Sequence, residues 1–315
     1  MQAVYIQNYG GVDQFQFGDL PEPSIKQNEV LVEVHASSVN PVDYKVRNGS
    51  IKLFSGKKFP KILGTDFSGT IVKAGESVTK FQAGDAVFGA VHVLFGKNGG
   101  NAEFVAAPQN SLALIPEGLS FEEAAAIPVA GTTAYHNLKN LNIRPGDKVL
   151  VNGASGGVGS FALQIAKLFG AEVTAVCSEK NFEFVKMLGA DNVIDYHVED
   201  FTMNDIKYNV IYDAYAHVKY GDVKNSLADK GIMLTPLPTP AIMIKSFMSK
   251  LFGGKKIIMA NANYADDNLI TLASWIVENK LILHIDKTFQ LEDLAEAHEQ
   301  LERGGGKGKL VVIVK

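Results

Sequence analysis

Short hydrophobic runs with alternating polar positions, separated by glycine and proline, occupy the first 115 residues of the chain. Clear examples are NEVLVEVHASSV (28–39), FSGTIVKAG (67–75) and GDAVFGAV (84–91). Alternation over this length, bounded by turn residues, is typical of β-strands. We expect this part of the chain to form an antiparallel or barrel-like β fold.

The pattern changes near residue 120, where helical periodicity begins. Segment 119–141 is rich in alanine and contains Ser120 and Glu123 at the spacing of a capping box. Next, DKVLVNG (147–153) has the pattern of a strand and GGVGSFALQIAKLFG (156–170) that of a helix, and further strands and helices follow. Strands that alternate with helices predict a parallel, doubly wound sheet.

From about residue 260 the chain returns to its first pattern, and it ends in a helix, a glycine turn and a strand (291–315). The sequence therefore predicts an α/β protein with a doubly wound parallel-sheet domain of the Rossmann type at residues 121–261. This domain is inserted into a β-rich domain made of residues 1–120 and 262–315.

Composition narrows the classes of function. Of the 315 residues, 46% are hydrophobic and 20% are charged, which is typical of a globular protein with a full core. The net charge is −4, and no concentrated basic patch points to a nucleic-acid partner. No stretch approaches 18 apolar residues, and the start MQAVYIQNYG lacks the features of a signal peptide. We expect a cytoplasmic protein without a membrane partner.

Cysteine and histidine usage argues against a metal site. Cys177 is the only cysteine, so neither a disulfide framework nor a zinc site of several thiolates can form. None of the seven histidines has a second histidine four residues away, the spacing found on metal-binding helices.

The strongest chemical signal is VLVNGASGGVGSFALQIAK (149–167), where a strand runs through a glycine turn into a helix. Small residues let the backbone approach a pyrophosphate, and the helix N-terminus offers free N–H groups and a positive dipole end. The alternative is a glycine turn that merely packs a helix on a strand. The candidate cofactor-binding residues of the turn are Ala154, Ser155, Gly156, Gly157 and Val158.

The end of the second strand of this unit discriminates between cofactors. NAD-binding folds usually place an acidic residue there, about 20 residues after the glycines, to hold the ribose 2′-hydroxyl. Here the strand ends at Ser178, followed by Glu179, Lys180 and Asn181. A hydroxyl, a cation and an amide suit the 2′-phosphate of NADP(H), whereas Glu179 could favour NAD. Ser178 and Asn181 could instead be helix caps.

Several ordered motifs together resemble the medium-chain dehydrogenase/reductase superfamily. They are N-P-V-D-x-K (40–45), G-T-D-x-S-G (64–69), A-G-T-T-A-Y (130–135), the glycine turn, and L-G-A-D-x-V-I-D-Y (188–196). Within that superfamily the chain is similar to the zinc-free, zeta-crystallin-like quinone oxidoreductases, and most closely to their enone oxidoreductase branch. The resemblance implies that the β-rich domain is a GroES-like catalytic domain.

The chain differs from the zinc-dependent branch at two positions. Asn40 to Asp43 stand where those enzymes have a zinc-binding cysteine, and Gly64-Thr65-Asp66 stands in place of their G-H-E motif. Without a Lewis acid, alcohol oxidation loses its usual mechanism. Reduction of an activated alkene needs only a hydride at the β-carbon and a hydrogen-bond donor for the enolate.

The resemblance also implies roles for individual residues. Lys45 would hold a ribose hydroxyl or stabilise and protonate the enolate, and Asn40 and Asp43 would frame the nicotinamide end of the site. Without the resemblance, Lys45 could be a solvated turn lysine and Asn40 a turn former before proline.

For the cofactor, the resemblance implies that Thr133 contacts the nicotinamide while Ser178 and Tyr196 flank the adenosine phosphate. The alternative for Tyr196 is a strand aromatic packed in the core. Segments 94–101 and 236–256 would lie near the active site, although each could be an ordinary surface loop or packed helix.

These observations predict an NADPH-dependent reductase of lipophilic α,β-unsaturated carbonyls or quinones that works by hydride transfer and, by analogy, forms a homodimer. Two alternatives stay open. One is a one-electron quinone reductase, and the other is a non-catalytic NADPH-binding sensor or structural protein.

Overall fold

The computed structural model describes residues 1–93, 98–236, 242, 244–246 and 254–315. The chain divides into two compact units. Unit 1 comprises Met1–Thr132, Tyr264–Asn279 and Leu283–Lys315, and unit 2 comprises Thr133–Asn263 and Lys280–Ile282. The first boundary lies inside a helix, after Thr132, rather than at residue 120. No helix in the described part of the chain is long and apolar enough to cross a membrane.

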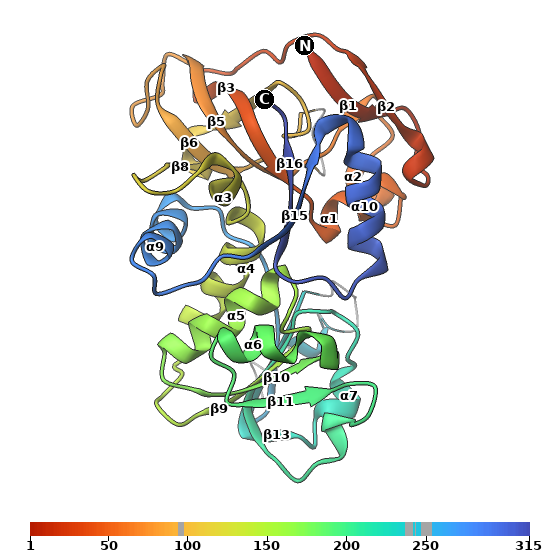
Figure 1. Cartoon of the computed structure of the whole chain (residues 1–315), viewed down its shortest axis with the longest axis vertical. Coiled ribbons are helices and arrows are strands. Elements are labelled where there is room, and N and C mark those ends of the chain that lie inside the picture. Colours follow the sequence, from red (N-terminus) through yellow and green to blue (C-terminus); the bar gives the residue numbers. More distant parts are fainter. Residues whose placement is uncertain (94–97, 237–241, 243, 247–253) are drawn as a thin grey trace. The chain divides into compact units, whose positions relative to one another are not determined.

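Unit 1 is a mainly antiparallel β structure (Figure 1). Its strands are β1 (Gln2–Ile6), β2 (Phe15–Asp19), β3 (Glu29–Ser38), β4 (Lys61–Ile62), β5 (Asp66–Ala74), β6 (Ala86–Ala90), β7 (Phe104–Pro108), β8 (Leu112–Leu114), β15 (Ile285–Gln290) and β16 (Lys309–Ile313). Its helices are α1 (Pro41–Arg47), α2 (Lys52–Ser55), α3 (Phe121–Ala125), α9 (Asp266–Val277) and α10 (Leu294–Arg303), with 3-10 turns η1 (Val12–Gln14), η2 (Gln109–Ser111) and η5 (Leu291–Asp293).

The long strand β3 organises unit 1. Its valines at alternate positions, Val30, Val32 and Val34, are fully buried because a period of two places them on one face of the sheet. β3 pairs with β5 and β7, and the last strand β16 adds antiparallel to its other end, with Val311 opposite Ser38. The two ends of unit 1 in the sequence therefore meet in one sheet.

Unit 2 contains a six-stranded parallel sheet in the order β11-β10-β9-β12-β13-β14. Its strands are β9 (Lys148–Asn152), β10 (Glu172–Cys177), β11 (Asn192–Asp195), β12 (Tyr208–Asp213), β13 (Leu227–Thr235) and β14 (Lys256–Met259). Its helices are α5 (Gly157–Leu168), α6 (Phe182–Met187) and α7 (Tyr220–Val223), with 3-10 turns η3 (Glu179–Asn181) and η4 (Phe201–Met203). The predicted α/β fold with a doubly wound sheet is confirmed.

The predicted helix after residue 119 is two helices, α3 and α4 (Pro128–Lys139). Proline has no N–H and favours the first turn of a helix, so Pro128 begins a new one. The capping box predicted for Ser120 is present: Ser120 N–H donates to Glu123 Oε2 at 2.9 Å, and Glu123 N–H donates to Ser120 Oγ at 3.1 Å.

Close packing of α5 on its sheet depends on a glycine. A Cβ on Gly159 would lie 2.0 Å from the carbonyl oxygen of Gly153 and 2.8 Å from Cα of Ala154, both backbone atoms that cannot move aside locally. Gly221 in α7 is a contrast, because a Cβ there meets nothing within 4 Å.

We predict that Gly159→Ala lowers the stability of unit 2 by about 1–3 kcal/mol, the usual cost of overpacking. Gly221→Ala, the matched control, should be neutral or slightly stabilising, since alanine is the better helix former. Thermal unfolding followed by circular dichroism compares the two. A Gly159→Ala melting temperature equal to that of the wild type would contradict the close-packing argument.

Candidate functional site

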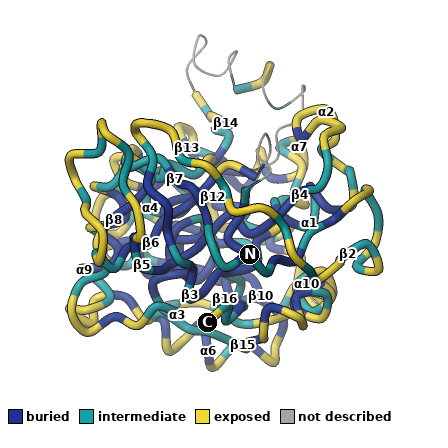
Figure 2. Tube along the Cα trace, turned by 90° about the horizontal axis from the view of Figure 1, so that it is seen from above, coloured by how far each residue is buried: buried dark blue, intermediate teal, exposed yellow. Residues whose placement is uncertain are grey.

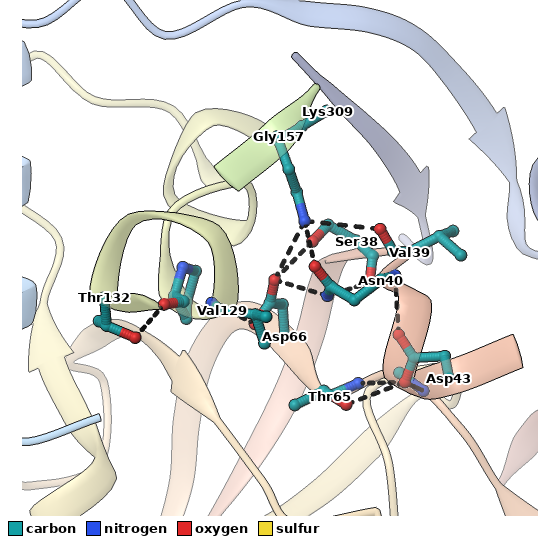
Figure 3. Close-up of polar contacts among 12 residues, drawn as sticks. Ser38, Val39, Asn40, Asp43, Thr65, Asp66, Val129, Thr132, Gly157 and Lys309 are labelled. Atoms are coloured by element: carbon teal, nitrogen blue, oxygen red, sulfur yellow. Dashed lines mark hydrogen bonds and ion pairs between the residues drawn. The ribbon is translucent and has the colours of Figure 1, made fainter. Parts of the chain in front are cut away.

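Six polar residues of unit 1 form a buried cluster where α1, β3, β5 and β16 meet (Figure 3). We call it the buried polar cluster. Its members, each at most 4% exposed, are Ser38, Asn40, Asp43, Thr65, Asp66 and Lys309. Because a buried polar group without a partner is costly, the hydrogen bonds of this cluster determine the orientation of each side chain.

Asp43 anchors the turn between β4 and β5 to the start of α1. Its Oδ1 accepts from the N–H of Thr65 at 3.1 Å, from the Thr65 hydroxyl at 2.9 Å and from the N–H of Gly64 at 3.3 Å. Its Oδ2 accepts from the N–H of Asn40 at 2.9 Å. Burial raises the pKa of Asp43 to about 6, while the bond from Thr65 opposes that rise. With four donors around it, the carboxylate is ionised at neutral pH and positions its neighbours.

Asn40 is held by two charged side chains. Lys309 Nζ donates to Asn40 Oδ1 at 2.6 Å, and Asn40 Nδ2 donates to Asp66 Oδ2 at 2.8 Å. Lys309 and Asp66 also form an ion pair, with Nζ 3.4 Å from Oδ2. The amide is therefore locked in one orientation. Asn40 precedes Pro41 at the start of α1, as the turn-forming alternative expected, and its side chain also bridges Lys309 and Asp66.

Asp66 is fully satisfied as a carboxylate. The Ser38 hydroxyl donates to its Oδ2 at 2.8 Å, and the N–H of Val129 donates to its Oδ1 at 2.9 Å. Burial raises the pKa of Asp66 and lowers that of Lys309, and in each case the opposite charge works against the shift. Because every partner of Asp66 is a donor, we assign the ionised pair at neutral pH.

Lys45 lies on α1, five residues after Asn40, and is half-buried. Burial lowers the pKa of its ammonium group. Among the described residues it forms neither an ion pair nor a hydrogen bond. A half-buried ammonium without a counter-charge is suited to bind an anionic oxygen and to give up a proton.

In unit 2, the glycine turn joins β9 to α5 as predicted. Gly156 is the N-cap of α5 and carries no side chain, so the N–H groups of the first turn are not capped by it. A Cβ on Gly156 would meet only the Gly153 carbonyl, at 3.5 Å, so no other group of the described chain packs within 4 Å of that point. Such an end fits a pyrophosphate.

Ser178 directly follows β10 and has a buried hydroxyl without a hydrogen-bond partner in the described part of the chain. Its side chain caps neither η3 nor α6. The side chain of Asn181 makes no capping hydrogen bond to α6 either, and its Nδ2 donates to Ser155 Oγ at 2.9 Å. It therefore braces the glycine turn from the neighbouring loop. An unpaired hydroxyl at this edge fits a phosphate oxygen.

Tyr196 follows β11 directly and is 55% exposed, so its packing in the core is excluded. The parallel register aligns Cys177 with Asp195, so Ser178 and Tyr196 follow neighbouring strands at the same edge of the sheet.

Thr133 lies in α4, and its carbonyl accepts from the Tyr212 hydroxyl at 3.0 Å. Of segments 94–101 and 236–256, residues 94–97, 237–241, 243 and 247–253 lie outside the described residues.

Comparison with known proteins identifies the family. Residues 26–117 match the family described as alcohol dehydrogenase GroES-like domain, and residues 188–312 match zinc-binding dehydrogenase. A chloroplast envelope quinone oxidoreductase homolog of Arabidopsis thaliana is 35% identical over 328 residues, covering 99% of this chain and 98% of that protein. The chain belongs to the quinone and enone oxidoreductases of the medium-chain dehydrogenase/reductase superfamily.

Two further relatives support this membership, which confirms the resemblance inferred from the motifs. An NADPH-dependent alkenal/one oxidoreductase of Arabidopsis thaliana is 33% identical over 321 residues, covering 99% of this chain and 79% of that protein. The structure of the quinone oxidoreductase of Coxiella burnetii aligns with a TM-score of 0.90 and 33% identity over 100% of this chain and 99% of that one.

One of the matching family descriptions mentions zinc. In this oxidoreductase, the described residues contain no group of three or more His, Cys, Asp or Glu side chains that could hold a metal ion. Thr65 stands at the position of the G-H-E histidine, and its hydroxyl donates a hydrogen bond to Asp43.

Sequence reasoning missed Asp66 and Lys309 as partners of Asn40. They lie 243 positions apart, and Lys309 follows a glycine turn that resembled a simple connection. The only signal in the sequence was a lysine at the start of the apolar strand KLVVI, where a charge is unusual and needs a partner.

We predict that Lys309→Met lowers the free energy of unfolding by about 3–5 kcal/mol, because Asp66 then stays buried without its counter-charge. Lys315→Met is the matched control: its ion pair with Glu33 is exposed, so its loss should cost about 1 kcal/mol or less. Urea unfolding measures both. Equal losses for the two variants would show that the buried pair carries no special weight.

Proposed function

We propose that this protein is an NADPH-dependent reductase of α,β-unsaturated carbonyl compounds, with quinones as further acceptors. The observation that carries this is the half-buried, unpaired Lys45 beside a rigid cluster that holds no metal-ligand set in the described chain. A relative named for alkenal/one reduction with NADPH supports the substrate class and the cofactor.

Bound NADPH would supply a hydride to the electron-poor β-carbon of the substrate. Lys45 donates a hydrogen bond to the carbonyl oxygen and stabilises the negative charge that develops on it. Its ammonium then gives a proton to the enolate, and solvent restores that proton. Asn40, held by Lys309 and Asp66, presents a fixed amide at the start of the same helix, and we assign it to nicotinamide positioning together with Thr133.

For the cofactor, the open N-terminus of α5 would hold the pyrophosphate, with the backbone of residues 154–158 around it. The Ser178 hydroxyl and Tyr196 would flank the 2′-phosphate. Asn181 acts indirectly in this proposal, because its amide is already bound to Ser155. We also propose, by analogy with the family, a homodimer.

We predict that Lys45→Ala lowers kcat for an alkenal by about 10²–10⁴-fold, the usual contribution of a positioned acid, while NADPH still binds. Lys26→Ala, at an exposed lysine of the same unit, is the control and should leave kcat unchanged. NADPH oxidation with an alkenal, an alkyl enone, an ortho-quinone and a simple ketone provides the measurement. Tight NADPH binding without turnover of any acceptor would favour the sensor alternative.

The pH dependence of kcat tests the proton role of Lys45. Its active form is the ammonium, and burial lowers its pKa from 10.5. Activity should therefore be complete at lower pH and fall as pH rises through that lowered pKa. Lys45→Arg keeps its charge at every pH used, so it should lose this alkaline decline while turning over slowly. An unchanged profile in Lys45→Arg would assign the decline to another group.

A one-electron quinone reductase remains the rival enzyme. It would release semiquinone, detectable by electron spin resonance, and turn over alkenals poorly. Stoichiometric reduction of the alkene without a radical signal distinguishes the two reactions.

We predict that Ser178→Asp raises KM for NADPH by at least about tenfold and leaves KM for NADH nearly unchanged, because the new carboxylate repels the 2′-phosphate. Asn192→Asp adds the same charge at the exposed opposite end of the neighbouring strand and should change neither value. Initial rates with both cofactors test this. Equal effects on NADPH and NADH would remove Ser178 from the 2′-phosphate site.

A further inference from the structure

The segment between Asp43 and Asp66 has an unusual charge balance. Residues 44–65 contain six cationic side chains and no Asp or Glu, although the whole chain has a net charge of −4. Arg47 is buried against Glu302, Lys61 is buried, and Lys45 is half-buried. The remaining three cations, Lys52, Lys57 and Lys58, are exposed.

These three lysines flank two exposed apolar side chains in the sequence. Leu53 is 92% exposed and Phe54 is 59% exposed, so neither contributes to the core of unit 1. We call residues 52–58 the α2 tip (Figure 2). Single exposed apolar residues are ordinary, but two adjacent ones flanked by three exposed lysines make this short segment amphipathic.

Hydrogen bonds from Lys61 and Tyr9 attach the α2 tip to the rest of unit 1. Lys61 Nζ donates to the Ser55 carbonyl at 2.6 Å, and the Tyr9 hydroxyl contacts Ser55 Oγ at 2.8 Å and the carbonyl of Gly56. The Lys61 ammonium also lies 5.1 Å from the centre of the Phe59 ring. Polar contacts therefore hold the backbone that directly follows Leu53 and Phe54, while both of these side chains are exposed.

The chemistry of the tip fits the surface of an anionic membrane. Apolar side chains gain by entering the acyl region, and lysines at the same depth extend their ammonium groups to anionic headgroups. A fluid surface needs no complementary shape, whereas a protein partner would need a groove matched to two protruding side chains. No helix of the described chain spans a membrane, so such contact is peripheral.

We propose that the α2 tip docks this protein on anionic phospholipid membranes, with Leu53 and Phe54 inserted and Lys52, Lys57 and Lys58 bound to headgroup phosphates. This revises our expectation that the protein has no membrane partner, which considered only spanning segments and signal peptides. Lipophilic enones and quinones partition into membranes, so docking would bring the enzyme to its substrates. The docking itself does not depend on the reductase activity.

Co-sedimentation of the full chain with vesicles tests the proposal. Vesicles of phosphatidylcholine with phosphatidylglycerol should bind the protein, and vesicles of phosphatidylcholine alone should bind it at least tenfold more weakly. The double variants Leu53→Ser/Phe54→Ser and Lys57→Glu/Lys58→Glu should each lose at least tenfold in binding to the anionic vesicles. Because the changed residues are exposed, both variants should keep the wild-type melting temperature.

Two matched controls carry equivalent changes elsewhere. Val198→Ser/Met203→Ser removes two apolar side chains that are 86% and 81% exposed, and Lys148→Glu/Lys230→Glu reverses two exposed lysines. Both should bind vesicles as the wild type does. No wild-type binding to anionic vesicles, or equal losses in the tip and control variants, would overturn the proposal.

A fluorescence measurement separates insertion from simple charge attraction. Phe54→Trp should show a blue-shifted tryptophan emission on addition of anionic vesicles, compared with the wild type, whose single tryptophan is Trp275. If binding depends on Lys57 and Lys58 but not on Leu53 and Phe54, and the emission does not shift, the tip is a site for polyanions or acidic proteins. That result would also overturn the proposal.

Discussion

The buried ion pair between Lys309 and Asp66 is the constraint around which unit 1 is built. Two charges removed from water are stable only when geometry and hydrogen bonds compensate their lost solvation. Here the compensation comes from the Ser38 hydroxyl, the N–H of Val129 and the amide of Asn40, which bridges the two charges. Asp66 and these three groups come from the first 129 residues, whereas Lys309 comes from β16, so the cluster is complete only when β16 has joined β3.

Two lysines of this unit illustrate how environment assigns a role. Lys309 is buried with a counter-charge and a fixed amide, so it is a structural element that orients Asn40. Lys45 is half-buried and has no partner among the described residues, so nothing compensates the lowering of its pKa by burial, whereas Asp66 opposes the same effect at Lys309. The chain thus keeps one lysine charged and immobile and leaves another ready to bind an oxygen or release a proton, five positions from the amide that the first one holds.

In unit 2, small and neutral residues determine how closely α5 packs and which polar groups at the edge of the sheet stay available for a ligand. A side chain on Gly159 would collide with the Gly153 carbonyl, so glycine lets α5 pack on its sheet, while Gly156 at the N-cap offers no side chain to cap the helix. The residue after the second strand, β10, is Ser178, whose hydroxyl is buried and unpaired among the described residues, and not an acidic residue. Asn181 supports the same turn through Ser155. The polar groups at this edge either brace the turn or remain available for a phosphate.

The sequence by itself determined the fold class, the glycine turn and the family, because local periodicity and contiguous motifs encode them. It also placed Asn40, Asp43 and Lys45 on one segment. Only the tertiary structure decided that Lys309 and Asp66 hold Asn40 and that Tyr196 lies outside the core. It also decided that the side chains of Ser178 and Asn181 make no capping hydrogen bond and that Leu53 and Phe54 are exposed. Those facts depend on strand register and on burial, which arise from contacts between residues far apart in the chain.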